Sequence, residues 1–185
     1  MITSIHLRLY NFRTGLGNLQ LFRILILYSS FMDNLFEPAT AETVISRLQQ
    51  IQSSAQPQWG KMNAAQMMAH CQATFEVYFG EKKLKRGLAS LLFGKMAKKK
   101  MFSNKPWPRN LPTAREFKIA DKRDIVLEKD KLIHLIKRFS TEGYNITETV
   151  HPFFGKMSSQ EWALFAYKHL DHHLTQFGVW VKWIQ

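Results

Sequence analysis

The chain has 185 residues, of which 45% are hydrophobic and 13% aromatic, so its composition is that of a folded globular protein and excludes a disordered tail. The formal net charge of +12 requires nucleic acid, anionic lipid and acidic ligands to be considered as partners. The single cysteine excludes an internal disulfide and fits a reducing compartment, so we expect a cytoplasmic protein.

The first 31 residues differ in character from the rest. They carry three basic residues and no acidic ones. Their most apolar stretch, Leu19–Met32, is interrupted by Arg23 and is shorter than the roughly 20 residues that a membrane-spanning helix needs. No small-residue cleavage site of the signal-peptide type follows it. Since Met32 opens a segment that reads as the start of a domain, we expect residues 1–31 to be a disordered extension or an over-long start, and residues 32–185 to form one domain.

Two amphipathic helices are predicted first. Apolar residues at helical spacing predict one helix over residues 40–54, before Pro57 and Gly60 interrupt the pattern. The second helix is predicted over residues 63–79, because Asn63 is a good N-cap and Gln66 stands three residues later, as in a capping box.

A long connection and a third helix follow. The stretch "KLKRGLASLLFGKMAKKKMF" predicts a short basic helix, and the three prolines of "NKPWPRNLP" predict an irregular crossing. From Asp124 to Thr141 apolar residues recur at helical spacing, which predicts a helix that ends near Gly143.

The last predicted helix starts at Ser158, where Glu161 completes a second capping box. No alternating run of apolar and polar residues indicates a sheet. The predicted fold is therefore all-α: a four-helix bundle with a long, partly helical crossover between its second and third helices.

Three histidines lie within "KHLDHHLTQFG" on the last helix. His169 and His173 are four residues apart and rise about 6 Å along one face, so both imidazoles can converge on one ion. His70 lies on the inward stripe of the second helix and can complete a three-histidine set. Three protein ligands leave a position open for water or substrate, as in catalytic metal sites.

Other interpretations stay open from spacing alone. A histidine on a core stripe is more often hydrogen-bonded than metal-bound, so a structural bundle with core histidines stands beside the metal site. The basic run Lys95–Lys100 and the overall charge favour a non-enzymatic module that binds nucleic acid or another polyanion. No nucleic-acid-binding fingerprint accompanies this charge, which disfavours nucleic acid; an anionic substrate explains the same charge.

Two segments, "QPQWGKMNAAQMMAHCQ" (Gln56–Gln72) and "HPFFGKMSSQEWALFAYKHLDHHLTQFG" (His151–Gly178), resemble the DinB/YfiT-like superfamily of proposed metalloenzymes, and within it an uncharacterised domain-of-unknown-function group. The resemblance runs from about Met32 to the end of the chain. It implies a four-helix bundle that binds a divalent ion, zinc or nickel, through His70, His169 and His173. Several relatives resemble thiol-dependent transferases or isomerases, which implies a low-molecular-weight thiol as a cofactor.

We therefore expect a metal-dependent enzyme that activates a thiol or water for the transfer or hydrolysis of a small molecule. Its partners are this small-molecule substrate, which the charge suggests is anionic, and a second copy of the chain if it forms a homodimer; no membrane span is expected. Neither inward stripe carries a carboxylate, because Glu76 and Asp171 project to the far sides of their helices. His172 is then the candidate for proton transfer, and Gln176 the candidate for orienting a ligand.

Three further residues are assigned structural roles. Cys71 points about 100° away from His70 on its helix and is expected to be a small buried hydrophobe. His134 and His151 are expected to be surface or loop-anchoring residues.

Overall fold

The computed structural model describes residues 34–103, 105–146 and 148–180. The predicted extension over residues 1–31 lies outside the described residues. Within the described part, the chain is mainly helical, with five α-helices, two short 3₁₀ turns and one two-stranded sheet.

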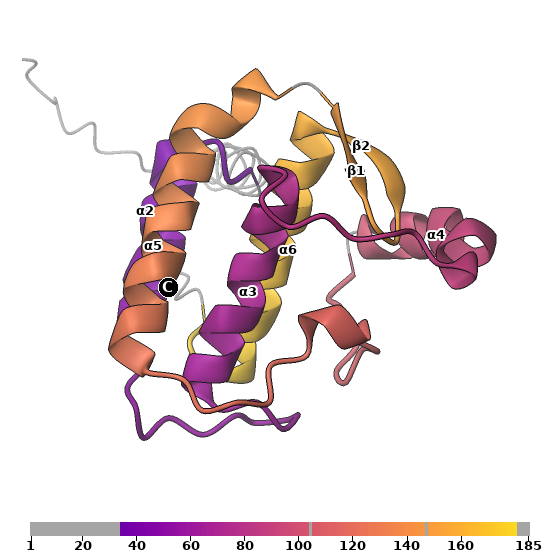
Figure 1. Cartoon of the computed structure of the whole chain (residues 1–185). Coiled ribbons are helices and arrows are strands. Elements are labelled where there is room, and N and C mark those ends of the chain that lie inside the picture. The colour runs from indigo at the N-terminus through magenta and orange to yellow at the C-terminus, as the bar shows by residue number, and fades with distance from the viewer. Residues whose placement is uncertain (1–33, 104, 147, 181–185) are drawn as a thin grey trace, which may run out of the picture. The chain divides into compact units, whose positions relative to one another are not determined.

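Four helices surround a common apolar core: α2 (Pro38–Gln49), α3 (Ala64–Tyr78), α5 (Ile125–Glu142) and α6 (Ser159–Gln176). Both α3 and α2 contact α5 and α6, and Figure 1 shows the four lying side by side. Apolar side chains from all four helices are buried there, which is the main stabilising term of such a fold. They include Leu48, Met68, Phe75, Leu132, Ile136, Trp162 and Leu170.

The capping residues set the starts of α3 and α6 as predicted. The Asn63 side chain accepts from the backbone N–H of Gln66 at 2.9 Å, and the Gln66 side chain accepts from the backbone N–H of Asn63 at 3.1 Å. Ser158 and Glu161 form the same reciprocal pair at 3.2 and 2.9 Å. Each cap satisfies helix N–H groups that have no partner within the helix, a contribution of about 1 kcal/mol.

The other helix boundaries agree less evenly with prediction. Asp124 caps α5, which ends at Gly143 as expected. The first predicted helix, over residues 40–54, is shifted: α2 begins at Pro38, whose fixed φ suits the first helical turn, and ends at Gln49. Ile51 is still buried although it lies beyond the helix. Its apolar side chain therefore indicates burial in the core and not membership of the helix.

The expectation of no sheet is wrong. Strands β1 (Glu148–His151) and β2 (Gly155–Ser158) form an antiparallel hairpin in which Val150 pairs with Lys156. With four residues each, the strands are too short to show a clear alternation of apolar and polar residues. The hairpin runs directly into α6, since the last residue of β2 is the N-cap of that helix.

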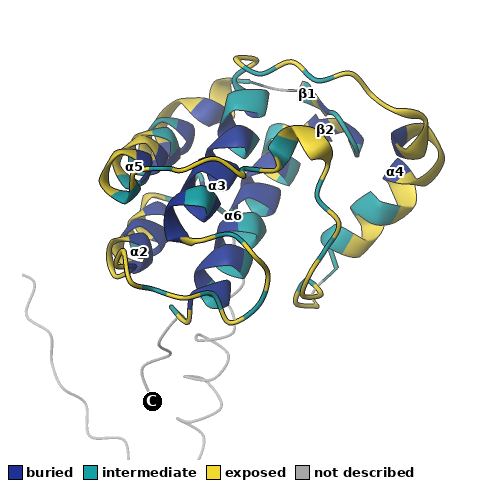
Figure 2. Cartoon of the chain, turned by 60° about the horizontal axis from the view of Figure 1, so that its bottom comes forward, coloured by how far each residue is buried: buried dark blue, intermediate teal, exposed yellow. Residues whose placement is uncertain are grey.

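The long connection between α3 and α5 contains helix α4 (Leu88–Met101) and the 3₁₀ turn η1 (Arg115–Phe117). The hydroxyl of Ser90 in α4 donates to the Phe153 carbonyl in the hairpin turn at 2.8 Å. A Cβ added to Gly94 would lie 2.4 Å from the same oxygen, so only glycine permits this close contact. Away from Ser90 and Gly94, much of α4 is exposed (Figure 2). The exposed residues include the apolar side chains of Leu88, Leu92 and Met96. No helix in the described ranges is long and apolar enough to cross a membrane.

Candidate metal centre

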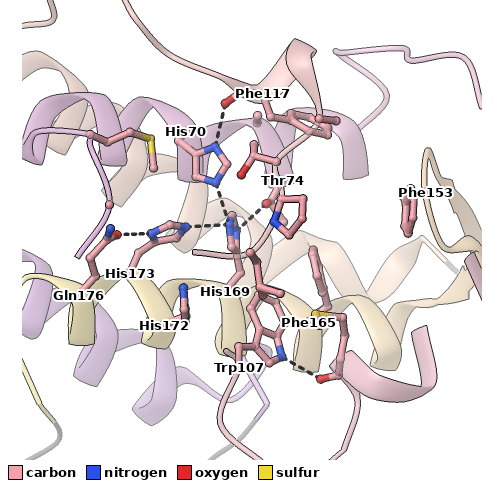
Figure 3. Close-up of a pocket in the computed structure, with 18 of the residues that line it drawn as sticks. His70, Thr74, Trp107, Phe117, Phe153, Phe165, His169, His172, His173 and Gln176 are labelled. Atoms are coloured by element: carbon pink, nitrogen blue, oxygen red, sulfur yellow. Dashed lines mark hydrogen bonds between the residues drawn. The ribbon is translucent and has the colours of Figure 1, made fainter. Parts of the chain in front are cut away.

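Three histidine side chains from two helices meet at one point between α3 and α6 (Figure 3). The Nε2 atom of His169 lies 3.1 Å from Nε2 of His70 and 3.2 Å from Nε2 of His173. The three ligand atoms all lie within 4.8 Å of one another. Nitrogens at about 2.0–2.1 Å from a tetrahedral zinc ion are about 3.3 Å apart, so the two shorter separations suit a shared ion.

On the outer side of each ring, which faces away from the meeting point, hydrogen bonds fix the tautomers of His70 and His173. Nδ1 of His70 lies 2.9 Å from the carbonyl oxygen of Phe117, and Nδ1 of His173 lies 2.8 Å from Oε1 of Gln176. The Gln176 amide is oriented by its Nε2, which donates to the carbonyl of Trp59 at 2.6 Å. Because both outer partners only accept, each Nδ1 carries the proton, and each Nε2 presents a lone pair to the centre.

The third ring completes a set that fits a cation. Nδ1 of His169 lies 2.9 Å from the hydroxyl of Thr74, which can donate or accept. Its Nε2 can offer one N–H at most, whereas two lone pairs face it, those of His70 and His173. A cation at the meeting point would accept from all three nitrogens at once. Outer-side hydrogen bonds of this kind are the usual support of metal-binding histidines.

Burial keeps the three imidazoles neutral. It lowers the pKa of His70, lowers that of His173 to about 3, and holds that of His169 well below its usual range. Repulsion between the neighbouring rings lowers the pKa values of His169 and His173 further. Histidine binds metal in its unprotonated form, so no proton has to be displaced at neutral pH.

The centre forms one wall of a cavity of about 550 Å³. Its other walls are largely aromatic, with Trp59, Trp107 and Phe165 among them, and no carboxylate from the described residues lines it. The ring of Trp107 lies 6.0 Å from that of His169, and its Nε1 donates to the Met101 carbonyl at 2.9 Å. A small molecule bound here would have an apolar body and would reach the histidines directly.

The remaining predicted residues lie as follows. His172 is half-buried and lines the same cavity, but it is not one of the three converging histidines. Gln176 accepts from Nδ1 of His173, on the side of the ring that faces away from the other two histidines, so it supports a proposed ligand. Cys71 is fully buried and burial raises the pKa of its thiol, in keeping with a hydrophobic role. Asp171 pairs with Arg47 at 2.8 Å and does not line the cavity.

Apart from Gln176, sequence reasoning did not single out the supporting groups. Thr74 follows His70 by one turn of the same helix, and this spacing is the available signal. The carbonyls of Phe117, at the end of η1, and of Trp59, in a loop, are backbone atoms, so no residue type marks them. Trp107 also lies in a loop, and nothing in the local pattern indicates that it covers the cavity.

For His151 the surface alternative is wrong, whereas the loop-anchoring alternative agrees with its contacts to the hairpin turn. His151 ends β1, is only 8% exposed, and stacks on Phe154 with ring centroids 4.3 Å apart. Its Nδ1 accepts from the backbone N–H groups of Phe153 and Phe154, each at 3.1 Å. Burial lowers the pKa of His151 to about 3. His134 is exposed on α5, as expected.

The low pKa of His151 predicts acid-sensitive folding. In the unfolded chain histidine takes up a proton near pH 6.5, whereas folded His151 resists it down to about pH 3, so stability falls as pH drops through this window. The loss is about 1.4 kcal/mol per pH unit, or roughly 2 kcal/mol between pH 6.5 and 5. Urea unfolding at pH 7.5 and 5.0 should show that His151→Asn weakens this pH dependence, whereas exposed His134→Asn leaves it unchanged. Equal pH dependence in all three proteins would contradict the assignment.

Gly60 shapes the support of His173. It has φ of +82°, and an added Cβ would lie 2.6 Å from Nε2 of Gln176. We expect Gly60→Ala to displace the Gln176 amide and to lower zinc affinity about 10- to 100-fold, the usual effect of losing an outer-side partner. Titration against a competing chelator measures this affinity.

Gly80→Ala is the matched control for this substitution. Gly80 also has a positive φ, of +73°, but a Cβ there would meet nothing within 4 Å. Both variants carry the backbone strain of an alanine in the left-handed region, about 1–2 kcal/mol. Only Gly60→Ala should change zinc affinity; an equal change in both would assign the effect to strain.

Comparison with known proteins gives one family. A family model described as "Protein of unknown function (DUF1569)" matches residues 35–179, a range that contains the three converging histidines and their supporting groups. No curated protein and no solved structure matches the chain.

Proposed function

Since the chain belongs to the family described as protein of unknown function (DUF1569), we propose its function from its own centre. We propose a metal-dependent enzyme in which His70, His169 and His173 hold one divalent ion, zinc or nickel. The reaction is the transfer or hydrolysis of a small molecule by an activated thiol or water. One observation carries the proposal: three imidazole nitrogens lie within 4.8 Å of one another, and each ring is held from behind by a hydrogen bond.

We propose further that the four packed helices form a four-helix bundle of the DinB/YfiT-like type. The packing of α2, α3, α5 and α6 supports this, as does the origin of the histidines, one from the second of these helices along the chain and two from the last. A low-molecular-weight thiol as cofactor belongs to the same proposal and rests on the resemblance alone.

The side chains around the centre have separable roles. A bound divalent ion would lower the pKa of a coordinated water or thiol towards neutrality. Trp107 and Phe165 exclude bulk water and hold the apolar part of a substrate. Gln176 orients the ring of His173. With no described carboxylate in the cavity, we assign proton transfer to His172, whose ring lies 5.6 Å from that of Trp59 and 5.9 Å from that of Trp107.

Metal analysis tests this proposal. Protein purified without an affinity tag, incubated with zinc or nickel and dialysed, should retain about one ion per chain, because a single three-histidine centre is available. His70→Ala and His173→Ala should each lose it under the same dialysis. Retention of no ion by the unmodified chain would leave the alternative of a structural bundle whose core histidines bond only to one another.

A further inference from the structure

Among the described residues that line the cavity, N–H groups without a protein acceptor include Nε1 of Trp59, Nε1 of Trp162 and Nε2 of His151. Trp59 lies beside His172, whereas Trp162 and His151 are neighbours, and the indole N–H of Trp162 is buried behind the cavity surface. Trp162 is fully buried, lines the cavity, and its Nε1 has no hydrogen-bond partner. His151 lines the cavity as well, and its ring lies 5.1 Å from that of Trp162. Neither residue belongs to the metal centre, so the proposed reaction leaves both donors unexplained.

The donor on His151 is fixed by the hairpin turn. Two backbone N–H groups, those of Phe153 and Phe154, point at Nδ1, which must therefore present its lone pair. The neutral ring then carries its proton on Nε2. Within the described part of the chain this Nε2–H donates to no protein acceptor. The low pKa of His151 means that it remains a neutral donor across the physiological range.

The buried, unpaired N–H of Trp162 is unusual. More than nine in ten buried polar groups in proteins are paired, and an unpaired one is destabilising. At Trp162 the aromatic neighbours Tyr78, His151 and Phe165 surround the indole. An acceptor supplied by a ligand would satisfy the indole N–H and the imidazole N–H.

We propose that His151 and Trp162 form a subsite for a hydrogen-bond acceptor, the carbonyl or carboxylate oxygen of an apolar small molecule. Lys61 is the only charged aliphatic side chain on the described cavity wall, and no described carboxylate lines it, so the wall favours the anionic form. This subsite would belong to the same active site as the proposed function. The proposal rests on that function in one respect only: the end of the ligand that reacts is taken to lie at the three histidines.

The helix sets the length of this ligand. Trp162 and His169 are seven residues, or two turns, apart on α6, which places them about 10 Å apart along its axis. Phe165 lies between them, stacked on His169 at an interplanar angle of 11° and edge-on to His151 at 76°. The ligand class is therefore an aryl or alkyl chain with an oxygen acceptor about 10 Å from its reacting end.

Two matched probes test the subsite: 6-phenylhexanoate, which ends in an acceptor, and 6-phenylhexylamine, which ends in a donor. Calorimetric titration of chelator-treated protein keeps the carboxylate from binding through a metal. Trp162→Phe, which removes the N–H and keeps an aromatic ring, should weaken 6-phenylhexanoate about 10- to 100-fold and leave the amine unchanged. His151→Asn removes the imidazole N–H and should have the same effect on the two probes. The oxygen of the asparagine side chain can still accept from the N–H groups of the hairpin turn, so the turn should be kept.

Trp107→Phe is the control, because the Nε1 of Trp107 already has an acceptor in Met101. It should change both probes by the same factor. The subsite is overturned if Trp162→Phe weakens both probes equally or neither, and this variant decides the matter if His151→Asn does not fold. A chain that binds no metal but prefers the acceptor probe keeps the subsite and loses the proposed reaction; the reverse result loses only the subsite.

Discussion

His169→Ala is expected to lower zinc affinity by about two to three orders of magnitude. Structural zinc sites with four protein ligands bind with about 10–16 kcal/mol, so one ligand contributes about 2.5–4 kcal/mol. His169 is the middle ring of the centre, since the nitrogens of His70 and His173 both lie closest to its Nε2. Its removal should leave only two imidazole ligands, which hold an ion more weakly than three.

Two other histidines provide the controls for this result. His172 lies next to a proposed ligand and lines the same cavity, whereas His134 is exposed on another helix. Chelator competition should give His172→Ala and His134→Ala zinc affinities within a few-fold of the unmodified chain. If His172→Ala were as damaging as His169→Ala, the set of ligands would have to be redrawn; if His169→Ala bound normally, the centre would not exist.

Much of the fold could be predicted because its information is local. Asn63 and Ser158 satisfy N–H groups within their own first helical turns, so their helix starts depend on residues three positions apart. The hairpin could not be predicted in this way. Its strands have four residues each, and the burial of His151 depends on Trp162 and Phe165, which belong to another element.

Part of the candidate centre could likewise be predicted from local sequence, and part could not. Helical periodicity places His70 on an inward stripe and aligns His169 with His173, so their meeting could be anticipated from two helices that face each other. Two of the groups that hold these rings are side chains on the same helices, Thr74 and Gln176, whereas the carbonyl oxygens of Phe117 and Trp59, which hold His70 and Gln176, come from segments distant in the sequence. Backbone atoms are the same in every residue, so a single sequence contains no signal for them.

Metal binding should also raise the thermal stability of the chain strongly. An ion that binds only the folded state at 100 times its Kd stabilises that state by about 2.7 kcal/mol. For a chain of 150–250 residues each kcal/mol shifts Tm by about 2–4 °C, so zinc should raise Tm by roughly 5–11 °C. The linkage is direct here, because the ion would join α3 to α6 and replace contacts between facing imidazoles.

Scanning calorimetry with zinc, nickel and magnesium measures the effect. Zinc and nickel suit imidazole ligands and should raise Tm, whereas magnesium prefers oxygen ligands and should not. His169→Ala should abolish the zinc-dependent shift, while Gly60→Ala should only reduce it, because its ligands remain and their support is displaced. A zinc shift that survives in His169→Ala would indicate binding elsewhere on the chain. An unmodified chain that shows no shift, at zinc concentrations that saturate three-histidine sites, would make the convergence of the rings a packing arrangement, with His169 donating its single N–H to one neighbour.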